Sequence, residues 1–419
     1  MSENTENDLV ATDPGDPRRV GPVATGIVGP TLALVAVVLV AAALRPGATS
    51  VGPVMAELRH QFGLNGAVAG LLTALPGLTF GAIGALAVAL ARRIGLTAGV
   101  FTGLVLIALG FLLRTFTGST AAFLACTLIG LAGMALGNVL VPAWIKRHGG
   151  GAVTRLMTAY SVTLLIGAAA ASILAAPLVR VAPGGWRAAL GVWGLAAGIG
   201  LLPWLVLTLR ERRDRADRAG APILPPSGSL LRSPTALALS LFFGMQALNA
   251  YAQFGWLPQI YRDAGLSGEA AGALLGLISL LGIVGGFLMP VWVERSADLT
   301  AGIVGFGVLT VGGYVGLWLA PAAVPWLWAG LLGLGGWAFT AAIAMITART
   351  HNPHVTARVS GFAQPVGYVL AGLGPLLVGV LYQVTHGWTA VLALLVGTAV
   401  VMTVAGLRLA RPTYVDDEI

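Results

Sequence analysis

The amino-acid sequence predicts an all-α integral membrane protein whose twelve transmembrane helices form two six-helix bundles. Hydrophobic residues make up 57% of the 419 residues and charged residues only 10%, whereas a soluble globular chain carries roughly a quarter charged residues. Apolar runs of about 20 residues recur along the whole chain, which is the length that a helix needs to cross a bilayer. The second half also repeats motifs of the first.

Twelve apolar segments, each bounded by charges or by Pro/Gly turns, are the expected spans. We predict that all of them are helical, because lipid offers the backbone no other hydrogen-bond partner. Their expected limits are 27–56, 65–91, 95–116, 119–145, 155–181, 186–209, 235–261, 268–293, 299–320, 323–349, 356–383 and 387–409.

These spans divide into an N-terminal bundle, residues 27–209, and a C-terminal bundle, residues 235–410. The stretch between them, 210–234, is charged and then Pro-rich, which is typical of a solvated linker. Residues 1–26 and 411–419 are expected to be cytoplasmic tails. The first tail is predicted to be disordered, since it is polar and lacks the basic-then-apolar layout of a cleaved signal.

The distribution of Lys and Arg predicts the orientation of the chain in the cytoplasmic (inner) membrane. The two tails and every second loop hold eighteen of the 24 Lys and Arg residues, the other loops hold five, and Arg45 lies within a span. By the positive-inside rule, both termini are then cytoplasmic.

The two halves repeat in register. "GLNGAVAGLL" (Gly63–Leu72) returns as "GLSGEAAGAL" (Gly265–Leu274), and "GGWRAAL" (Gly184–Leu190) returns as "HGWTAVL" (His386–Leu392), both at an offset of 202. A six-span unit repeated in the same orientation predicts two bundles related by an axis along the membrane normal. Substrate is then expected to bind between them, near the membrane midplane.

Catalytic and metal-binding motifs are absent from the sequence. The single cysteine, Cys126, excludes an internal disulfide, and one Cys with five scattered His gives no metal-ligand spacing. There is no Walker loop, nucleophile elbow or HExxH motif. We therefore expect no enzyme activity, no metal, no cofactor and no nucleic-acid partner; the expected partners are a small molecule and the lipid bilayer, with the monomer as the functional unit.

The segment "AAALRPGATSVGP" (Ala41–Pro53) contains Arg45, the only clearly intramembrane charge. It lies twelve residues before Glu57, about 18 Å from that end of the span at roughly 1.5 Å per residue, which is near the midplane. An arginine there costs about 2.5–3.5 kcal/mol on insertion scales, and it stays charged. No Asp, Glu or His lies in the middle of a span, which disfavours a membrane-embedded proton relay; coupling through Glu57 or through the substrate stays open.

Two interpretations of Arg45 follow. Its guanidinium faces a wet cavity and binds an anionic or strongly dipolar substrate, with Thr49 assigned to the same site. Alternatively, it donates to helix carbonyls freed by Pro46 and Pro53, or it extends outward to the membrane surface. Pro46 and Gly47 also predict a local weakening of the helix beside the charge.

The repeat places the seventh span opposite Arg45. There Gln246, Asn249, Gln253 and Trp256 follow the spacing i, i+3, i+7, i+10, which is one helical face. This polar stripe predicts a cavity wall, and the alternative is an interhelical hydrogen-bond seam.

Further neutral polar residues suit the orientation of a small polar molecule. The candidates in the fourth, fifth and eleventh spans are Asn138, Tyr160, Ser161, Gln364 and Tyr368.

Four motifs resemble those of one transporter family. They are "LRPGATSVGPV" (Leu44–Val54), "AGLLTALPGLTFG" (Ala69–Gly81), "GNVLVPAWIKR" (Gly137–Arg147) and "GGWRAALGVW" (Gly184–Trp193). The chain resembles the major facilitator superfamily and, within it, the cyanate/2-nitroimidazole (CynX/NimT-like) transporters, from about residue 30 to residue 405. The resemblance implies a secondary transporter for a small anion or a small nitrogen heterocycle, and it carries Arg45 and Asn138 as site residues.

The gating loops depart from the superfamily pattern. The loop after the second span has Arg92 and Arg93 but no acidic residue, whereas the equivalent loop after the eighth span holds Glu294, Arg295 and Asp298. These five residues are the predicted cytoplasmic gate, and it is expected to be asymmetric.

The sequence as a whole predicts a secondary active or facilitated transporter of a small anion or a small polar nitrogen compound, cyanate- or nitroimidazole-like. Rocker-switch alternating access is the expected mechanism. The alternative is multidrug or antimicrobial efflux by the same fold, with Arg45 in a structural role.

Overall fold

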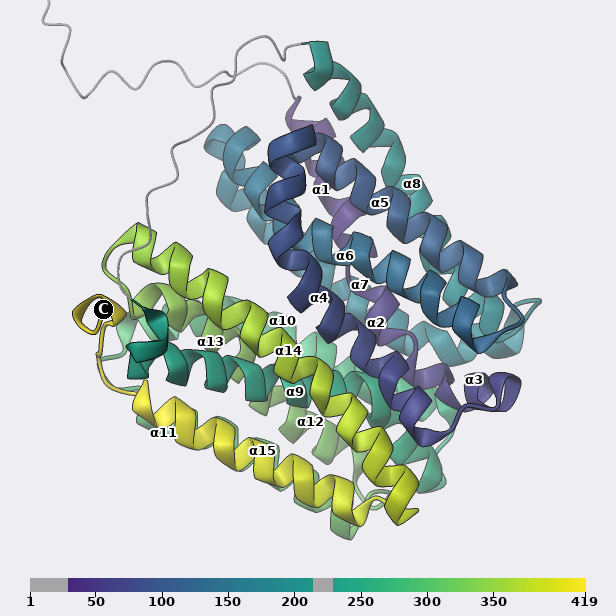
Figure 1. The fold of residues 1–419 in the computed structure, drawn as a ribbon. Coiled ribbons are helices and arrows are strands. Elements are labelled where there is room, and N and C mark those ends of the chain that lie inside the picture. The colour runs from purple at the N-terminus through teal and green to yellow at the C-terminus, as the bar shows by residue number, and fades with distance from the viewer. Residues whose placement is uncertain (1–28, 214–228) are drawn as a thin grey trace, which may run out of the picture.

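The computed structural model describes residues 29–213 and 229–419, and within them every regular element is a helix (Figure 1). The all-α prediction is thereby confirmed. The expected tail 1–26 and most of the linker 210–234 lie outside the described residues.

The helices fall into two sets of six spans. The first set is α1 (Pro30–Ala43), α2 (Pro46–Thr49), η1 (Gly52–Val54), α3 (Met55–Phe62), α4 (Gly66–Ile94), α5 (Leu96–Leu113), α6 (Thr120–His148), α7 (Val153–Val181) and α8 (Trp186–Arg213). The second set is α9 (Pro234–Asp263), α10 (Gly268–Arg295), α11 (Thr300–Leu319), α12 (Pro325–Gly335), α13 (Ala338–Ala348), α14 (Pro353–Thr385) and α15 (Thr389–Arg408). The first span comprises α1, α2, η1 and α3, and the tenth comprises α12 and α13.

Hydropathy and length make these helices membrane-spanning. Eleven candidate spans among the described residues are long and apolar enough to cross a bilayer. The remaining span, α9, is a continuous helix of 30 residues, and the polar residues Gln246, Asn249 and Gln253 interrupt its apolar sequence.

Side-chain caps explain where several helices begin. The side chains of Asn65, Ser119, Ser233 and Ser267 each accept a hydrogen bond from the backbone N–H three residues on, at the starts of α4, α6, α9 and α10. Such caps satisfy donors that the first turn of a helix leaves free.

The two bundles meet along two helix pairs, α4 with α14 and α7 with α10. Glycines allow the close approach in the first pair: a Cβ on Gly77 would lie 2.6 Å from the backbone nitrogen of Gly372, and one on Gly70 3.0 Å from the carbonyl oxygen of Pro375. Without a hydrophobic drive between helices in lipid, such small residues supply the packing.

The first span is broken at Arg45, which confirms the predicted weakening. Helix α1 ends at Ala43, and Arg45 has φ −123° and ψ −32° as the residue before α2. Pro46 cannot donate the next helical hydrogen bond. Gly47 is required by close packing, because a Cβ there would lie 2.1 Å from Cζ of Phe111.

The last residues of the chain pack against two helix starts. Carboxylate oxygens of Asp416 accept hydrogen bonds from the backbone N–H groups of residues 351–352, just before α14, at 2.8 and 2.9 Å. The carboxylate of Glu418 accepts from the side chain of Ser233 and from the backbone and side chain of Thr235, at the start of α9. The expected tail 411–419 therefore lies on the second bundle.

Candidate functional site

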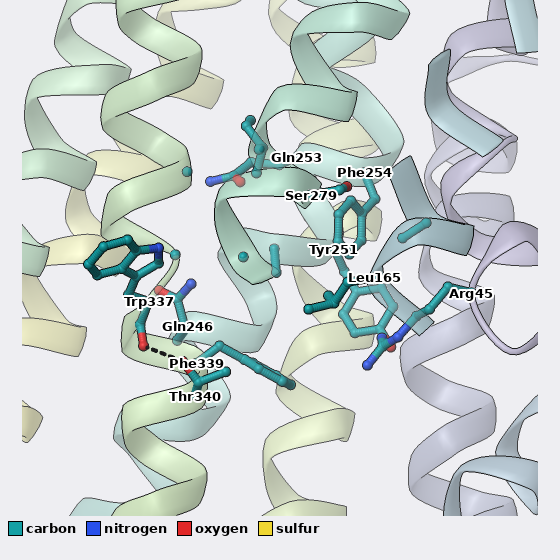
Figure 2. Close-up of a pocket in the computed structure, with 16 residues that line it drawn as sticks. Arg45, Leu165, Gln246, Tyr251, Gln253, Phe254, Ser279, Trp337, Phe339 and Thr340 are labelled. Atoms are coloured by element: carbon teal, nitrogen blue, oxygen red, sulfur yellow. Dashed lines mark hydrogen bonds between the residues drawn. The ribbon is translucent and has the colours of Figure 1, made fainter. Parts of the chain in front are cut away.

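A cavity lies between the bundles, where the break in the first span faces the middle of α9 and the break in the tenth span. Its volume is about 110 Å³, which is smaller than most sites for drug-sized molecules and suits a small ligand. Its lining residues are Arg45, Leu165, Ala168, Gln246, Ala250, Tyr251, Gln253, Phe254, Ile278, Ser279, Gly282, Gly333, Gly336, Trp337, Phe339 and Thr340 (Figure 2).

Arg45 enters this cavity from the first bundle. Figure 2 shows its guanidinium on one side of the cavity, with Gln246 and Trp337 on the other. Its Nε is buried and has no hydrogen-bond partner. Within the described residues, no carboxylate pairs with it. The charge of Arg45 is therefore left for water or a ligand to balance.

Three tyrosines lie near Arg45. Tyr160 of α7, Tyr251 of α9 and Tyr368 of α14 all lie close enough to interact electrostatically with its guanidinium. The Tyr251 hydroxyl is buried without a well-aligned hydrogen-bond partner. Tyr251 lines the cavity, whereas the predicted site residues Tyr160 and Tyr368 lie near Arg45 but are not among the cavity residues.

The glutamines of α9 line the opposite wall. Gln246 is buried, and its Oε1 has no hydrogen-bond partner. Gln253 lines the cavity, and its Nε2 donates to the Tyr314 hydroxyl at 3.0 Å. The cavity therefore presents neutral polar groups on the side away from Arg45.

Asn249 belongs to an interhelical seam in this structure. Its Oδ1 accepts from the Tyr314 hydroxyl at 2.9 Å and from Oγ1 of Thr398 at 3.2 Å. Its Nδ2 donates to the carbonyl oxygen of Met245 at 2.9 Å. Asn249 is fully buried and does not line the cavity, so α9 combines both interpretations of its polar stripe: Gln253 faces the cavity and Asn249 the seam.

Trp256, the last residue of that stripe, packs towards α14. Its Nε1 donates to the carbonyl oxygen of Pro375 at 3.0 Å, and its ring contacts Tyr382 and Trp388. It is buried outside the cavity lining.

Three other predicted residues bond within their own segments and do not line the cavity. Oγ1 of Thr49 donates to the Arg45 carbonyl at 3.4 Å. Nδ2 of Asn138 donates to the Met134 carbonyl at 2.9 Å, and Nε2 of Gln364 donates to Oγ of Ser360 at 2.8 Å. None of the three is among the cavity residues in this structure.

Ion pairs join the bundles at the end of the molecule away from the termini, called here the far end. Arg262 of α9 pairs with Glu57 of α3 at 3.1 Å, and Arg180 of α7 pairs with Glu269 of α10 at 2.7 Å. Each pair joins one bundle to the other, so the far end is closed.

The predicted gating residues lie at the opposite end, called here the termini end. Arg92 and Arg93 are in the last turn of α4, and Glu294 and Arg295 end α10. Asp298 accepts from the Thr300 backbone N–H at 2.7 Å, and hydrogen bonds from Thr300 hold the pKa of Asp298 below its usual value. No ion pair between these predicted gating residues occurs in the described part of the chain.

Sequence reasoning missed several cavity residues. Tyr251 was off the helical face that the spacing picked out. Trp337, Phe339 and Thr340 enter the cavity where the tenth span breaks between α12 and α13. The available signal was the glycine-rich motif "GLGGWA" (Gly333–Ala338), which contains the break.

Comparisons with known proteins agree with this architecture. The model of the Major Facilitator Superfamily matches residues 37–375. A 2-nitroimidazole transporter of Escherichia coli (strain K12) is 34% identical over 90% of this chain and 94% of its own length. The cyanate transport protein CynX of the same organism is 30% identical over 85% and 91%. The crystal structure of a bacterial homologue of the human lysosomal transporter Spinster, 18% identical, superposes with a TM-score of 0.71 over 92% of this chain and 97% of that one.

These comparisons all indicate common descent with one family of transporters. The family model spans most of the chain, the relatives align over nearly their whole length, and the two-bundle fold is shared. They indicate a multi-pass membrane transporter and not an enzyme. The chain belongs to the Major Facilitator Superfamily, in the group that includes the 2-nitroimidazole and cyanate transport proteins.

Proposed function

We propose that this protein moves a small anion or a small polar nitrogen compound, cyanate- or nitroimidazole-like, across the cytoplasmic membrane by alternating access. The observation that carries the proposal is Arg45: a permanent cation at a helix break, facing a cavity between the bundles, with an unpaired Nε and no carboxylate partner among residues 29–213 and 229–419. Binding an anion or a strong dipole would supply what this site lacks. The names of the two relatives support the same substrate class.

The proposed roles of the other residues follow from their positions. Gln253 contacts the bound molecule from the wall opposite Arg45. Tyr160 and Tyr368 lie near Arg45 outside the cavity lining and reach the bound molecule in another conformation. Asn249 is a positioning residue, since it holds the Tyr314 hydroxyl to which Gln253 donates. Four further residues complete the proposed site. They shape the helices around it or reach the substrate in another conformation, and they are Thr49, Asn138, Trp256 and Gln364.

The proposed transport cycle opens the cavity to one side at a time. Closure of the far end by ion pairs supports a conformation that faces the termini end. The positive-inside distribution makes that end cytoplasmic, and the predicted gate of Arg92, Arg93, Glu294, Arg295 and Asp298 would close it in the opposite conformation. The proposed unit is a monomer, driven by the substrate gradient and the membrane potential, with Glu57 as the place where a proton would couple.

A second candidate, efflux of apolar drugs or antimicrobials, is favoured by the aliphatic and aromatic parts of the same wall, which include Leu165, Phe254, Ile278 and Phe339. In that case Arg45 would be structural.

Binding and uptake in proteoliposomes test the proposal. Radiolabelled cyanate and 2-nitroimidazole are compared for the wild type, Arg45→Ala, Arg45→Lys and a control, Arg187→Ala, which removes an arginine stacked on Trp186 away from the cavity. We expect Arg45→Ala to lose at least tenfold in affinity, Arg45→Lys to retain part of it, and Arg187→Ala to resemble the wild type. Unchanged binding by folded Arg45→Ala protein, with apolar drugs transported instead, would favour efflux.

A further inference from the structure

The two interfaces between the bundles, α4–α14 and α7–α10, are equivalent under the sequence repeat, but different side chains close them. An offset of 202 or 203 carries α4 onto α10 and α7 onto α14, so the α4–α14 pair corresponds to the α10–α7 pair. The α4–α14 pair is close from the far end, where Gly66 lies against Gly379, to the middle of α4, where Gly81 lies beside Val369.

The α7–α10 pair is close only near the far end. A Cβ on Gly272 would lie 2.6 Å from the Ser172 carbonyl oxygen, and one on Gly276 2.3 Å from Ile173. Towards the termini end the helices part, and a groove with a volume of about 520 Å³ separates them.

Leu165 stands where the two helices part. It lines both the Arg45 cavity and the groove. Its two methyl groups are the nearest atoms to a Cβ built on Gly282 and on Gly286, at 3.9 and 4.0 Å. One leucine side chain thus forms the boundary between the two spaces.

The position equivalent to Leu165 in the other interface is Tyr368, at an offset of 203. The Tyr368 ring packs edge-on against Phe80 of α4 and Phe243 of α9, with ring centroids 5.7 and 5.4 Å apart. An aromatic cluster spanning both bundles therefore closes the α4–α14 side, whereas an aliphatic side chain facing two glycines closes the α7–α10 side.

The α7 wall of the groove carries a row of hydroxyl groups among apolar side chains. Thr154, Thr158 and Ser161 follow the spacing i, i+4, i+7 on α7, and the facing wall includes Phe287 and Pro290 of α10. The Thr158 hydroxyl donates to the Thr154 carbonyl oxygen at 2.9 Å and so keeps its acceptor side for a passing molecule. A row of hydroxyl groups that leads to Leu165 suits a small polar molecule, because a hydroxyl can accept hydrogen bonds as well as donate one.

We infer that the substrate passes between the Arg45 cavity and the termini end along the α7–α10 groove, with Leu165 as the gate and the hydroxyl row of Thr154, Thr158 and Ser161 as a transient binding surface. The inference rests on the proposed function, since it concerns the route to the same cavity. The α4–α14 interface stays closed in this conformation, and the substrate does not pass through it.

The rates of substrate exchange test this route. Gly286→Leu fills the groove beside Leu165 from a position that is not itself a cavity residue, and Gly305→Leu is the matched control, since a Cβ on Gly305 meets nothing within 4 Å. With cyanate or 2-nitroimidazole, we expect Gly286→Leu to slow association and dissociation about tenfold while Kd stays within twofold of the wild type. We expect Leu165→Ala to speed both rates severalfold. Wild-type exchange rates in folded Gly286→Leu would overturn the inference.

Thiol labelling gives an independent readout if Gly286→Leu folds poorly. In a Cys126→Ser background, a bulky thiol reagent on Ser161→Cys is expected to block exchange, and on Val369→Cys, at the α4–α14 seam, to leave it unchanged. Block at Val369→Cys alone would overturn the one-sided route. Failure of wild-type protein to bind either substrate, or unchanged binding by Arg45→Ala, would instead count against the proposed function.

Discussion

Arg262 and Glu57 form an ion pair across the boundary between the two bundles, with Nη1 of Arg262 3.1 Å from both carboxylate oxygens. The same Nη1 lies 3.4 Å from the carbonyl oxygen of Pro53. Glu57 and Pro53 follow the break at Arg45 in the same span. The span that holds the cation therefore also makes the contacts with Arg262 that close the far end.

Replacing Glu57 by Gln is expected to shift the protein towards states with an open far end. Partly exposed ion pairs contribute about 0.2–1 kcal/mol, which is roughly a 1.4- to 5-fold change in the ratio of states. Spin labels at Gly118→Cys and Ala323→Cys, in a Cys126→Ser background, would measure the distance between the far-end loops.

The matched control for this measurement is Glu269→Gln. Its partner, Arg180, is 68% exposed, against 27% for Arg262, and solvent screening weakens such a pair. We expect a smaller shift than for Glu57→Gln. An equal or larger shift would show that Arg262 and Glu57 do not hold the far end closed.

Replacing Tyr314 by Phe is expected to destabilise the seam and to weaken substrate binding. The hydroxyl donates to Asn249 and accepts from Gln253, and hydrogen bonds between membrane helices contribute about 0.6–1.7 kcal/mol. Thermal unfolding and substrate affinity would be measured together. Tyr261→Phe, which loses one bond to the Pro325 carbonyl, should lower stability without changing affinity; equal affinity losses in both variants would argue against positioning of Gln253 by Tyr314.

Stability should fall in acid as the contacts of Glu418 are lost. Burial opposes ionisation of Glu418, but hydrogen bonds from Ser233 and Thr235 outweigh it, so its pKa lies below the usual 4.5. A carboxyl whose pKa is lowered by folding stabilises fully above its unfolded pKa, and the effect disappears as pH falls through the folded pKa.

Glu418→Gln tests this contribution. Hydrogen bonds to charged groups contribute about 1.5–3 kcal/mol, so we expect a lower Tm at pH 7 and a smaller difference from the wild type near pH 4. Asp417→Gln, at a neighbouring position without these contacts, serves as the comparison. A constant Tm difference across this pH range would contradict the linkage.

Substituting Gly52 by Ala is expected to disturb the conformation closed at the far end. A Cβ at Gly52 would lie 2.1 Å from the Phe254 carbonyl oxygen, which belongs to backbone and cannot move aside cheaply. Overpacking of this kind costs about 1–3 kcal/mol. Gly198→Ala in α8, where a Cβ meets nothing within 4 Å, should be neutral or slightly stabilising by the same thermal assay. Similar Tm values for the two variants would refute the close packing.

The fold and the break at Arg45 were predictable because their causes are local. Hydrophobic run length specifies the spans, and Pro46 beside an arginine specifies a discontinuity. The repeat also placed the polar face of α9 opposite Arg45 before any contact was known.

The sequence could not predict that Gln253 lines the cavity while Asn249 bonds between helices. The partners of Asn249 are Tyr314 and Thr398, which are 65 and 149 residues away from it. Trp337 likewise reaches the cavity only through the break in the tenth span. The contacts of Glu418 with the start of α9 have no periodic signature, since they join residues more than 180 positions apart.

The fixed charge of Arg45 has an electrical consequence for transport. With Arg45 near the middle of the membrane, as proposed, a bound monovalent anion cancels its charge, so the loaded reorientation step moves little current. The empty step moves up to one charge through the field, which is about 2.3 kcal/mol per 100 mV. Under the proposed anion transport by alternating access, an inside-negative voltage would therefore hold the unloaded protein open to the inside, and the return of the empty carrier would become the voltage-dependent step of the cycle.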